Sequence, residues 1–192
     1  MRIGKGIILV AIVCIILFFL SCKDVASVED QLPAVTKEGK NTFGCYIDNN
    51  LFLAQTTLFG QVKPLRASYT YKENAAALPP QPAGTFMLFA IDARYSLQQA
   101  GIIGVVLPAI FKEGTYSLVS DRCTANEFCK SIYYDNASSS ETYLAKSGQL
   151  VITRLDTTNQ IISGTFGFTA ISDSGKQIVI TDGRFDVTYP LQ

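Results

Sequence analysis

Any chemistry in this chain has to be done without histidine, because none of its 192 residues is one. The lack of an imidazole excludes Ser-His-Asp and Cys-His catalysis within the chain, together with every metal or haem site that needs a histidine ligand. The commonest general base near neutral pH is missing as well. The side chains left for chemistry are carboxylates, cysteines and tyrosines.

Paired carboxylates can hydrolyse glycosidic bonds without histidine, provided that one carboxyl has a raised pKa and acts as the acid. Most candidates here stand beside turn formers or alternate outward along expected strands, where hydration accounts for them. No two are marked as a pair, and no segment has the spacing of a calcium-binding loop. We therefore expect a non-catalytic protein without metal or cofactor, and keep a histidine-free hydrolase as the weaker alternative. The candidates are Asp92, Asp121, Glu127, Asp135, Asp156, Asp182 and Asp186.

Cys22 carries the most specific signal among the cysteines. It follows a start that is charged at Arg2 and Lys5 and a run of 14 apolar residues from Ile7 to Leu20. A spanning helix needs about 20 such residues, so the run predicts an export signal. The stretch "FLSC" at 19–22 resembles the bacterial lipobox, although Phe19 stands where leucine is more usual. The alternatives are an ordinary cleaved signal and a short uncleaved anchor.

The lipobox resemblance implies cleavage before Cys22, a diacylglycerol on its thiol and an acylated amine, with palmitate as a typical chain. Two or three acyl chains hold a protein firmly at about 0.8 kcal/mol per buried CH₂, whereas one chain is marginal. Lys23, rather than aspartate, follows the cysteine. By the enterobacterial sorting rule this favours the outer membrane, on either its periplasmic or its surface-exposed face.

The remaining cysteines predict one disulfide and one buried thiol. Cys123 and Cys129 have five residues between them, and a disulfide suits an exported chain. Its short loop would contribute about 2 kcal/mol; two free thiols are the alternative. Cys45 alternates with Phe43 and Ile47, which predicts a thiol that faces the core.

Tyrosine and threonine supply two further hypotheses. Exposed tyrosines could stack on sugars or peptides, but tyrosine also suits half-buried strands, and we favour that plainer explanation. "DTT" at 156–158 resembles the acceptor motif for O-glycosylation in bacteria of this kind, with the sugar on Thr157. The tyrosines concerned are Tyr69, Tyr71, Tyr95, Tyr116, Tyr133, Tyr134 and Tyr143.

The charge balance argues against a nucleic-acid partner. The chain has 16 basic and 16 acidic residues, and removing Arg2 and Lys5 with the signal leaves 14 against 16. A nucleic-acid binder needs a basic surface. The expected partners are the membrane, through the lipid, and an envelope protein, glycan or peptide.

The chain divides into three segments. Residues 1–21 are the expected signal peptide, 22–42 the lipidated cysteine with a flexible polar tether, and 43–192 a globular domain. From Phe43 onward, short alternating runs separated by turn formers predict nine to eleven strands in an antiparallel β-sandwich or flattened barrel. The segment 93–101 could form one or two helical turns. "GTFGFTA" (164–170) and "GRFDVTY" (183–189) share a pattern in which glycine leads into a strand.

Four stretches are similar to a family of uncharacterised lipoproteins of Bacteroidota-type bacteria. They are "LPAVTKEGKNTFGCYIDNNLFLA", "GTYSL", "LVITRLDTTNQIISGTFGFTA" and "VITDGRFDVTY". The resemblance covers essentially the whole mature chain and is vague between residues 60 and 140. It implies the fold and the cell-envelope location but no active site. We expect a lipid-anchored interaction or accessory domain, with a glycan- or peptide-binding module of an outer-membrane uptake assembly as the alternative.

Overall fold

The computed structural model describes residues 31–56, 63–74, 81–94, 96–108, 112–120 and 130–190. These residues form eleven strands and one 3-10 turn, and no α-helix occurs among them. The first strands are β1 (Thr42–Ile47), β2 (Asn50–Leu53), β3 (Gln55–Thr56), β4 (Leu65–Asn74) and β5 (Gln81–Ala93). After the 3-10 turn η1 (Leu97–Gln99) come β6 (Gly101–Pro108), β7 (Gly114–Ser117), β8 (Ser131–Asn136), β9 (Glu141–Asp156), β10 (Ile161–Ser172) and β11 (Gln177–Thr188).

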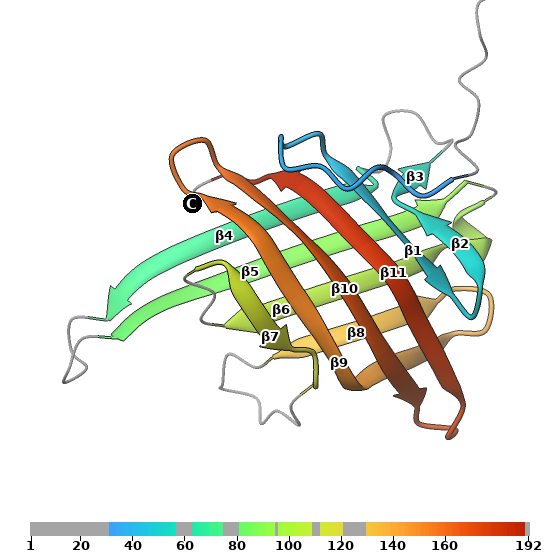
Figure 1. The fold of residues 1–192 in the computed structure, drawn as a ribbon. Helices are drawn as coiled ribbons and strands as arrows, with labels where there is room; N and C mark the ends of the chain where they lie inside the picture. Colours follow the sequence, from blue (N-terminus) through green and yellow to red (C-terminus); the bar gives the residue numbers. More distant parts are fainter. Residues whose placement is uncertain are drawn as a thin grey trace, which may run out of the picture.

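All eleven strands belong to one curled sheet (Figure 1). Its main path runs β2-β1-β11-β10-β9-β8-β6-β5-β3, while β4 pairs with β5 and β7 with β9. Every pairing is antiparallel except that of β3 with β5. The all-β prediction is confirmed, and of its two forms the barrel describes the arrangement. The segment 93–101 contains only the short η1, which Ser96 caps by accepting a hydrogen bond from the Gln99 backbone.

The sheet nearly closes because β2 and β3 are one run of chain interrupted at Ala54. β2 pairs with β1 at one end of the sheet path, and β3 pairs with β5 at the other. A buried ion pair reinforces this seam: Arg94 Nη2 lies 2.7 Å from Asp92 Oδ2, with the side chains only 7% and 13% exposed. Asp92 also accepts from the Leu53 N–H at 3.1 Å, and Arg94 donates to the Leu51 carbonyl at 2.7 Å.

Alternating side chains of the strands fill the interior. Along β10, Ile162, Phe166, Phe168 and Ala170 are buried and face inward, as period-2 alternation requires. Cys45 is completely buried in the same core, which confirms the expected position of this thiol. Burial, and then the nearby charge of Asp92, raise its pKa well above the ordinary value.

The repeated glycine pattern in β10 and β11 has a structural cause. The two strands pair so that Gly164 faces Phe185 and Phe166 faces Gly183. A Cβ on Gly183 would lie 2.5 Å from the Phe166 ring, and one on Gly164 would lie 2.9 Å from that of Phe185. Each glycine therefore leaves the space that the aromatic ring of the opposite strand occupies.

Residues 33–41, which we call the strap, lie on the outside of the barrel beside β11 (Figure 1). The strap is the latter part of the predicted flexible tether. Backbone and side-chain donors from Thr36 to Lys40 bind the carboxylate of Asp186 on β11. This part of the segment is thus attached to the folded domain, and the part of the predicted tether up to residue 30 lies outside the described residues. No helix in the described part of the chain is long and apolar enough to cross a membrane.

Candidate functional site

Two hollows are the candidates for a binding site. One, the barrel mouth, lies at the end of the barrel where the β1–β2 turn and the residues around η1 come together, and has a volume of about 370 Å³. Its wall is rich in the residue types that bind ligands. The lining residues are Ile47, Asp48, Asn50, Leu51, Phe52, Asp92, Arg94, Gln99, Gly101, Tyr134, Asn136, Tyr143 and Ile178.

Most polar side chains of the barrel mouth already serve the fold, and among the described lining residues the Gln99 amide and the Tyr134 hydroxyl are the exceptions. Asp92 and Arg94 hold the seam, and Asp48 accepts from the Val179 N–H at 2.8 Å. Asn136 accepts from the backbone of the following turn at 2.9 Å. The Tyr143 hydroxyl donates to Glu141 at 2.8 Å, and this bond, together with those from Lys176 and Ser174, lowers the pKa of Glu141 to about 2. A ligand would have to displace these contacts, so the mouth is the weaker candidate.

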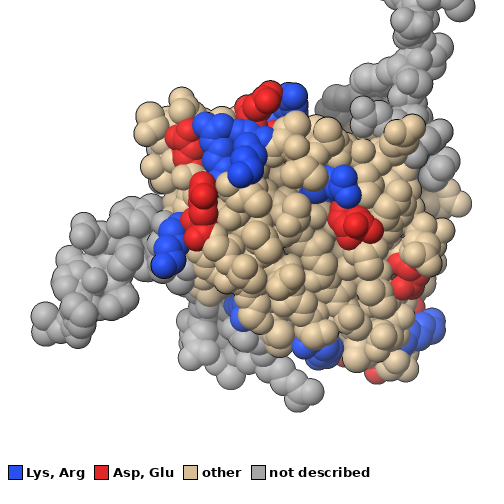
Figure 2. Space-filling model, viewed as in Figure 1, with Lys and Arg blue, Asp and Glu red and all other residues tan. Residues whose placement is uncertain are grey.

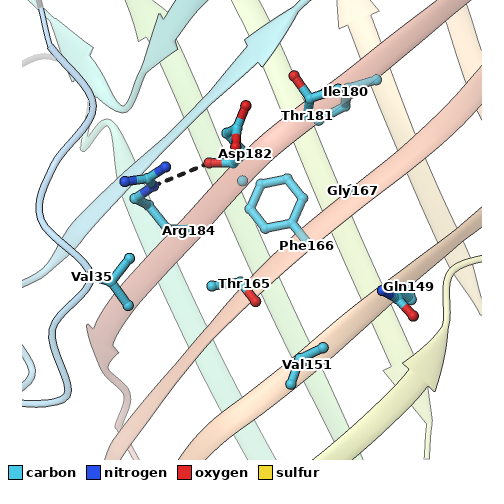
Figure 3. Close-up of a pocket in the computed structure, with 11 residues that line it drawn as sticks. Val35, Gln149, Val151, Thr165, Phe166, Gly167, Ile180, Thr181, Asp182 and Arg184 are labelled. Atoms are coloured by element: carbon cyan, nitrogen blue, oxygen red, sulfur yellow. Dashed lines mark hydrogen bonds between the residues drawn. The ribbon is translucent and has the colours of Figure 1, made fainter.

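The second hollow, which we call the outer hollow, is a depression of about 420 Å³ on the outside of the sheet (Figure 3). Side chains from β9, β10 and β11 surround it, and Val35 of the strap forms the wall opposite Gln149. The lining residues are Val35, Gln149, Val151, Thr165, Phe166, Gly167, Ile180, Thr181, Asp182, Gly183 and Arg184.

A β-bulge and a glycine create the outer hollow. Phe166 pairs with Gly183 and Phe168 with Ile180, so Gly167 alone faces both Thr181 and Asp182. The extra residue in β11 places Asp182 at a φ of 52°, and bulges of this kind bend a strand locally. Gly167 points outward between β9 and β11 without a side chain. A Cβ there would meet only the Ile180 carbonyl, at 3.3 Å.

The polar groups around the outer hollow are available to a ligand. Among the described residues, no hydrogen bond or ion pair uses the side chains of Gln149, Thr165 or Thr181 or the carboxylate of Asp182. Arg184 donates from Nε to the Asp182 carbonyl at 3.1 Å, the bond drawn in Figure 3. The rim therefore offers two hydroxyls, an amide, a carboxylate and a guanidinium, with no net charge.

The wider face around the outer hollow also has no excess of charge of one sign. Figure 2 shows acidic and basic side chains next to one another toward the strap end of this face, with few charges over the remainder. The ion pairs Arg154–Asp156, at 2.6 Å, and Lys40–Glu38, at 3.1 Å, are examples of this mixing. A strongly charged ligand such as a nucleic acid would find no complementary field here.

Among the carboxylates proposed from sequence, Asp121 and Glu127 lie outside the described residues. The others are not brought together as an acid and base pair in the described part of the chain. Asp92 lies in the seam, and Asp186 is buried beneath the strap. Asp156 accepts bonds from Asn159 and Arg154, which hold its pKa well below the usual range. Asp182 alone borders the outer hollow, and one oxygen of Asp135 is buried without a partner in the described part of the chain. A general acid needs a raised carboxyl pKa, whereas the resolved shifts at Asp156, Asp186 and Glu141 are downward.

The other predicted site residues are spread over the molecule. Thr157 is exposed in the turn between β9 and β10, a position open to modification, and its O-glycosylation stays a prediction. Tyr69 and Tyr143 are buried, with 2% and 6% exposure, so they are core rather than a ligand-stacking patch. The lipidation residue Cys22 and the disulfide pair Cys123 and Cys129 lie outside the described residues.

Sequence reasoning missed the features that build the outer hollow. The sequence indicated Gly167 only as one residue of a strand pattern. No sequence feature predicted that the strap lines the outer hollow. The nearest signal was the run of positive-φ formers before β1, since Gly39 and Asn41 adopt φ values of 74° and 56°. Such residues predict a fixed turn rather than a free linker.

The comparison with protein families matches residues 105–187 to a domain of unknown function (DUF6252). The match begins within β6 and ends near the end of β11, so it contains β7 to β11 and the sheet part of the outer hollow but not the strap. No curated protein and no solved structure was found to be similar to the chain.

Proposed function

We propose that this protein is a lipid-anchored cell-envelope protein that binds a neutral, hydroxyl-rich ligand, such as a glycan segment, in the outer hollow without catalysing a reaction. The observation that carries the proposal is the set of unengaged polar side chains around an apolar floor. Gln149, Thr165, Thr181 and Asp182 surround the hollow, and Val35 contributes an apolar wall. A concave, partly apolar site with a small number of converging polar groups is typical of ligand binding.

A glycan suits the rim better than a peptide strand. Peptides that bind to sheets usually add a strand to a free edge, but β10 is paired along both sides, with β9 and with β11. Recognition must therefore use side chains. Hydroxyl, amide, carboxylate and guanidinium groups can all exchange hydrogen bonds with sugar hydroxyls, and the zero net charge of the rim does not oppose a neutral ligand.

The expected affinity for one sugar unit is low. At about −0.3 kcal/mol per heavy atom, the efficiency of drug-sized ligands, a hexose with about 12 heavy atoms would gain roughly −4 kcal/mol, which corresponds to a Kd near 1 mM. The hollow also has no exposed aromatic platform among its lining residues, since Phe166 is only 6% exposed. A longer glycan that continues along the uncharged face would bind more tightly than a single sugar.

Anchoring by lipid at Cys22 fits this role. The docked strap leaves only residues 22–32 between the proposed lipid and Pro33, a reach of at most about 40 Å at full extension. The domain would therefore stay close to the membrane surface. Its ligand would be a glycan of the envelope or one delivered to it, as in an uptake assembly.

The test is to fill the outer hollow without disturbing the sheet. Gly167→Leu adds an outward side chain to the floor of the hollow, where its Cβ would have a single close neighbour, the Ile180 carbonyl oxygen at 3.3 Å. The matched control is Thr169→Leu, the next outward residue of β10, which does not line the hollow. Both variants and the parent chain would be applied to an array of neutral oligosaccharides, and the strongest hit would be titrated calorimetrically.

We expect the parent and Thr169→Leu to bind the same oligosaccharide and Gly167→Leu to lose at least tenfold in affinity. The thermal midpoints of the two variants should agree, which shows that the loss is local. If Gly167→Leu binds as well as its control, the outer hollow is not the site. Binding of the parent chain to no neutral oligosaccharide would reject the ligand class.

A further inference from the structure

One carboxylate, that of Asp186, accepts four of the hydrogen bonds that hold the strap on the barrel. Asp186 Oδ2 accepts from Thr36 Oγ1 at 2.6 Å, from the Glu38 N–H at 2.9 Å and from the Lys40 N–H at 3.2 Å. Its Oδ1 accepts from the Gly39 N–H at 2.8 Å and from Ser163 Oγ at 2.6 Å. Four of these five donors belong to the strap. Hydrogen bonds to a charged acceptor are roughly twice as strong as neutral ones.

Four further hydrogen bonds, at three places along the strap, support this attachment. Asn41 Oδ1 accepts from the backbone and hydroxyl of Thr188 at 2.9 and 3.0 Å. Arg154 donates to the Lys37 carbonyl, and Arg184 lies 3.5 Å from the Pro33 carbonyl. All four are polar and partly exposed contacts, and water can replace them.

Apolar burial contributes little to the strap. None of residues 33–41 is buried, and Val35 is 56% exposed. The core of the barrel, in contrast, consists of side chains from the strands. Since few apolar contacts mark the segments that open first, the strap can leave the barrel while the core stays folded.

We propose that the strap is a releasable wall of the outer hollow and that Asp186 is the positioning residue that latches it. Docking places Val35 at the hollow, so ligand affinity and strap docking are coupled. The coupling is reciprocal: a ligand that contacts Val35 holds the strap down, and release of the strap weakens the ligand. The proposed lipid at Cys22 lies on the same segment of chain, so movement of the domain away from the membrane would act on the strap first.

The first part of this inference, that Asp186 holds the strap on the barrel, is independent of any ligand. It is tested by hydrogen–deuterium exchange. The whole mature chain in detergent micelles would be compared with Asp186→Asn and with Asp182→Asn, which removes the same charge from the exposed side of the same strand. Exchange would be read with residue-level fragmentation at the amides of Glu38, Gly39 and Lys40.

We expect these three amides to exchange at least tenfold faster in Asp186→Asn, and unchanged in Asp182→Asn, while the amides of β10 stay protected in both. Equal protection in Asp186→Asn and the parent would overturn the latch. Loss of protection throughout the sheet would overturn the idea that the strap opens separately. Should Asp186→Asn not fold, Thr36→Ala removes one donor from the strap side and is expected to raise exchange at the same amides.

The coupling half rests on the proposed function and has its own test. Val35→Ser keeps the latch but removes the apolar wall, and it should lower affinity for the oligosaccharide chosen above by threefold or more without changing exchange at Glu38 to Lys40. Added oligosaccharide should slow exchange at these amides in the parent chain. If Asp186→Asn frees the strap but the affinity is unchanged, the latch stands and the coupling is wrong. If no oligosaccharide binds at all, the proposed function and the coupling fail together, while the exchange experiment still decides whether Asp186 holds the strap.

Discussion

Asp186 and Gly39 are 147 residues apart in sequence, and yet the Gly39 N–H donates to the buried carboxylate of Asp186 at 2.8 Å. Ser163 donates to the same oxygen from β10 at 2.6 Å. The carboxylate therefore joins the beginning of the described chain to the two strands that precede its end. A buried charge is tolerated only when it is fully hydrogen-bonded, so Asp186 depends on the strap as much as the strap depends on Asp186.

Acid should weaken the protein through Asp186. Burial alone would raise the pKa of this carboxyl, but bonds from Ser163, Thr36 and the strap backbone hold it well below its usual range. In the unfolded chain the pKa is about 3.9. The stabilisation is therefore complete above about pH 4 and is lost as the pH falls toward the lower folded value, by up to about 1.4 kcal/mol per pH unit.

Urea unfolding at pH 7, 4 and 3 would measure this effect as the difference between the parent chain and Asp186→Asn, which cancels the contributions of other carboxyls. We expect Asp186→Asn to be less stable by about 2–3 kcal/mol at pH 7 and the difference to shrink below pH 4. A difference that stays constant with pH would contradict the low pKa of Asp186 in the folded state.

Gly183 should not tolerate even a methyl group. Its Cβ would lie 2.5 Å from the Phe166 ring, which is packed among other core aromatics. We expect Gly183→Ala to destabilise the protein by about 1–3 kcal/mol through overpacking. Gly167→Ala is the control, because its Cβ points outward and meets one carbonyl at 3.3 Å. Thermal unfolding of both variants checks the prediction, and equal midpoints would show that the Phe166 ring can move aside.

The seam ion pair should matter far more than an ion pair at the surface. Arg94→Met leaves the carboxylate of Asp92 buried without its partner, and we expect a loss of about 3–5 kcal/mol in the free energy of unfolding. Arg154→Met breaks the more exposed pair with Asp156 and should cost much less. Chemical denaturation of the two variants compares them directly. Similar losses would mean that the seam does not depend on Asp92 and Arg94.

Cys22→Ala should abolish lipid attachment. We expect the precursor to stay uncleaved at this position and to take up no labelled palmitate in cells, because the thiol is the acceptor. The readouts are metabolic labelling and the mass of the protein. A variant that still matures to the parent's size and remains in the membrane fraction would contradict the lipobox hypothesis.

The thiols give a separate test of export. If Cys123 and Cys129 form the predicted disulfide, Cys45 is the one free thiol of the mature chain apart from the lipidated residue. Its complete burial and raised pKa predict that it reacts with alkylating agents only after denaturation. Mass spectrometry of a non-reduced digest decides the pairing, and three alkylated thiols, or a bridge that includes Cys45, would rule the arrangement out.

The fold class and the exclusion of histidine-dependent chemistry could be predicted from the amino-acid sequence alone. Alternation such as that of Phe43 and Cys45 depends only on which face of a strand is buried, so it predicts strands and the buried thiol without knowledge of their partners. The absence of histidine is likewise a property of composition. The pairing of Phe166 with Gly183 is reflected in the repeated glycine pattern of 164–170 and 183–189. The pattern alone does not predict this pairing, because the pairing depends on the register between the two strands.

The near-closure of the sheet, the docking of the strap and the outer hollow could not be predicted without the three-dimensional structure. Each depends on contacts between residues far apart in the chain, such as Thr36 with Asp186 or Gln55 on β3 with Asp92 on β5. The polar residues of the strap resemble those of a free linker, since the same side chains can bind water or a carboxylate. Whether such a segment docks or stays free depends on the presence of a buried acceptor, here the carboxylate of Asp186, at the matching position. That position is set by the packing of β10 and β11.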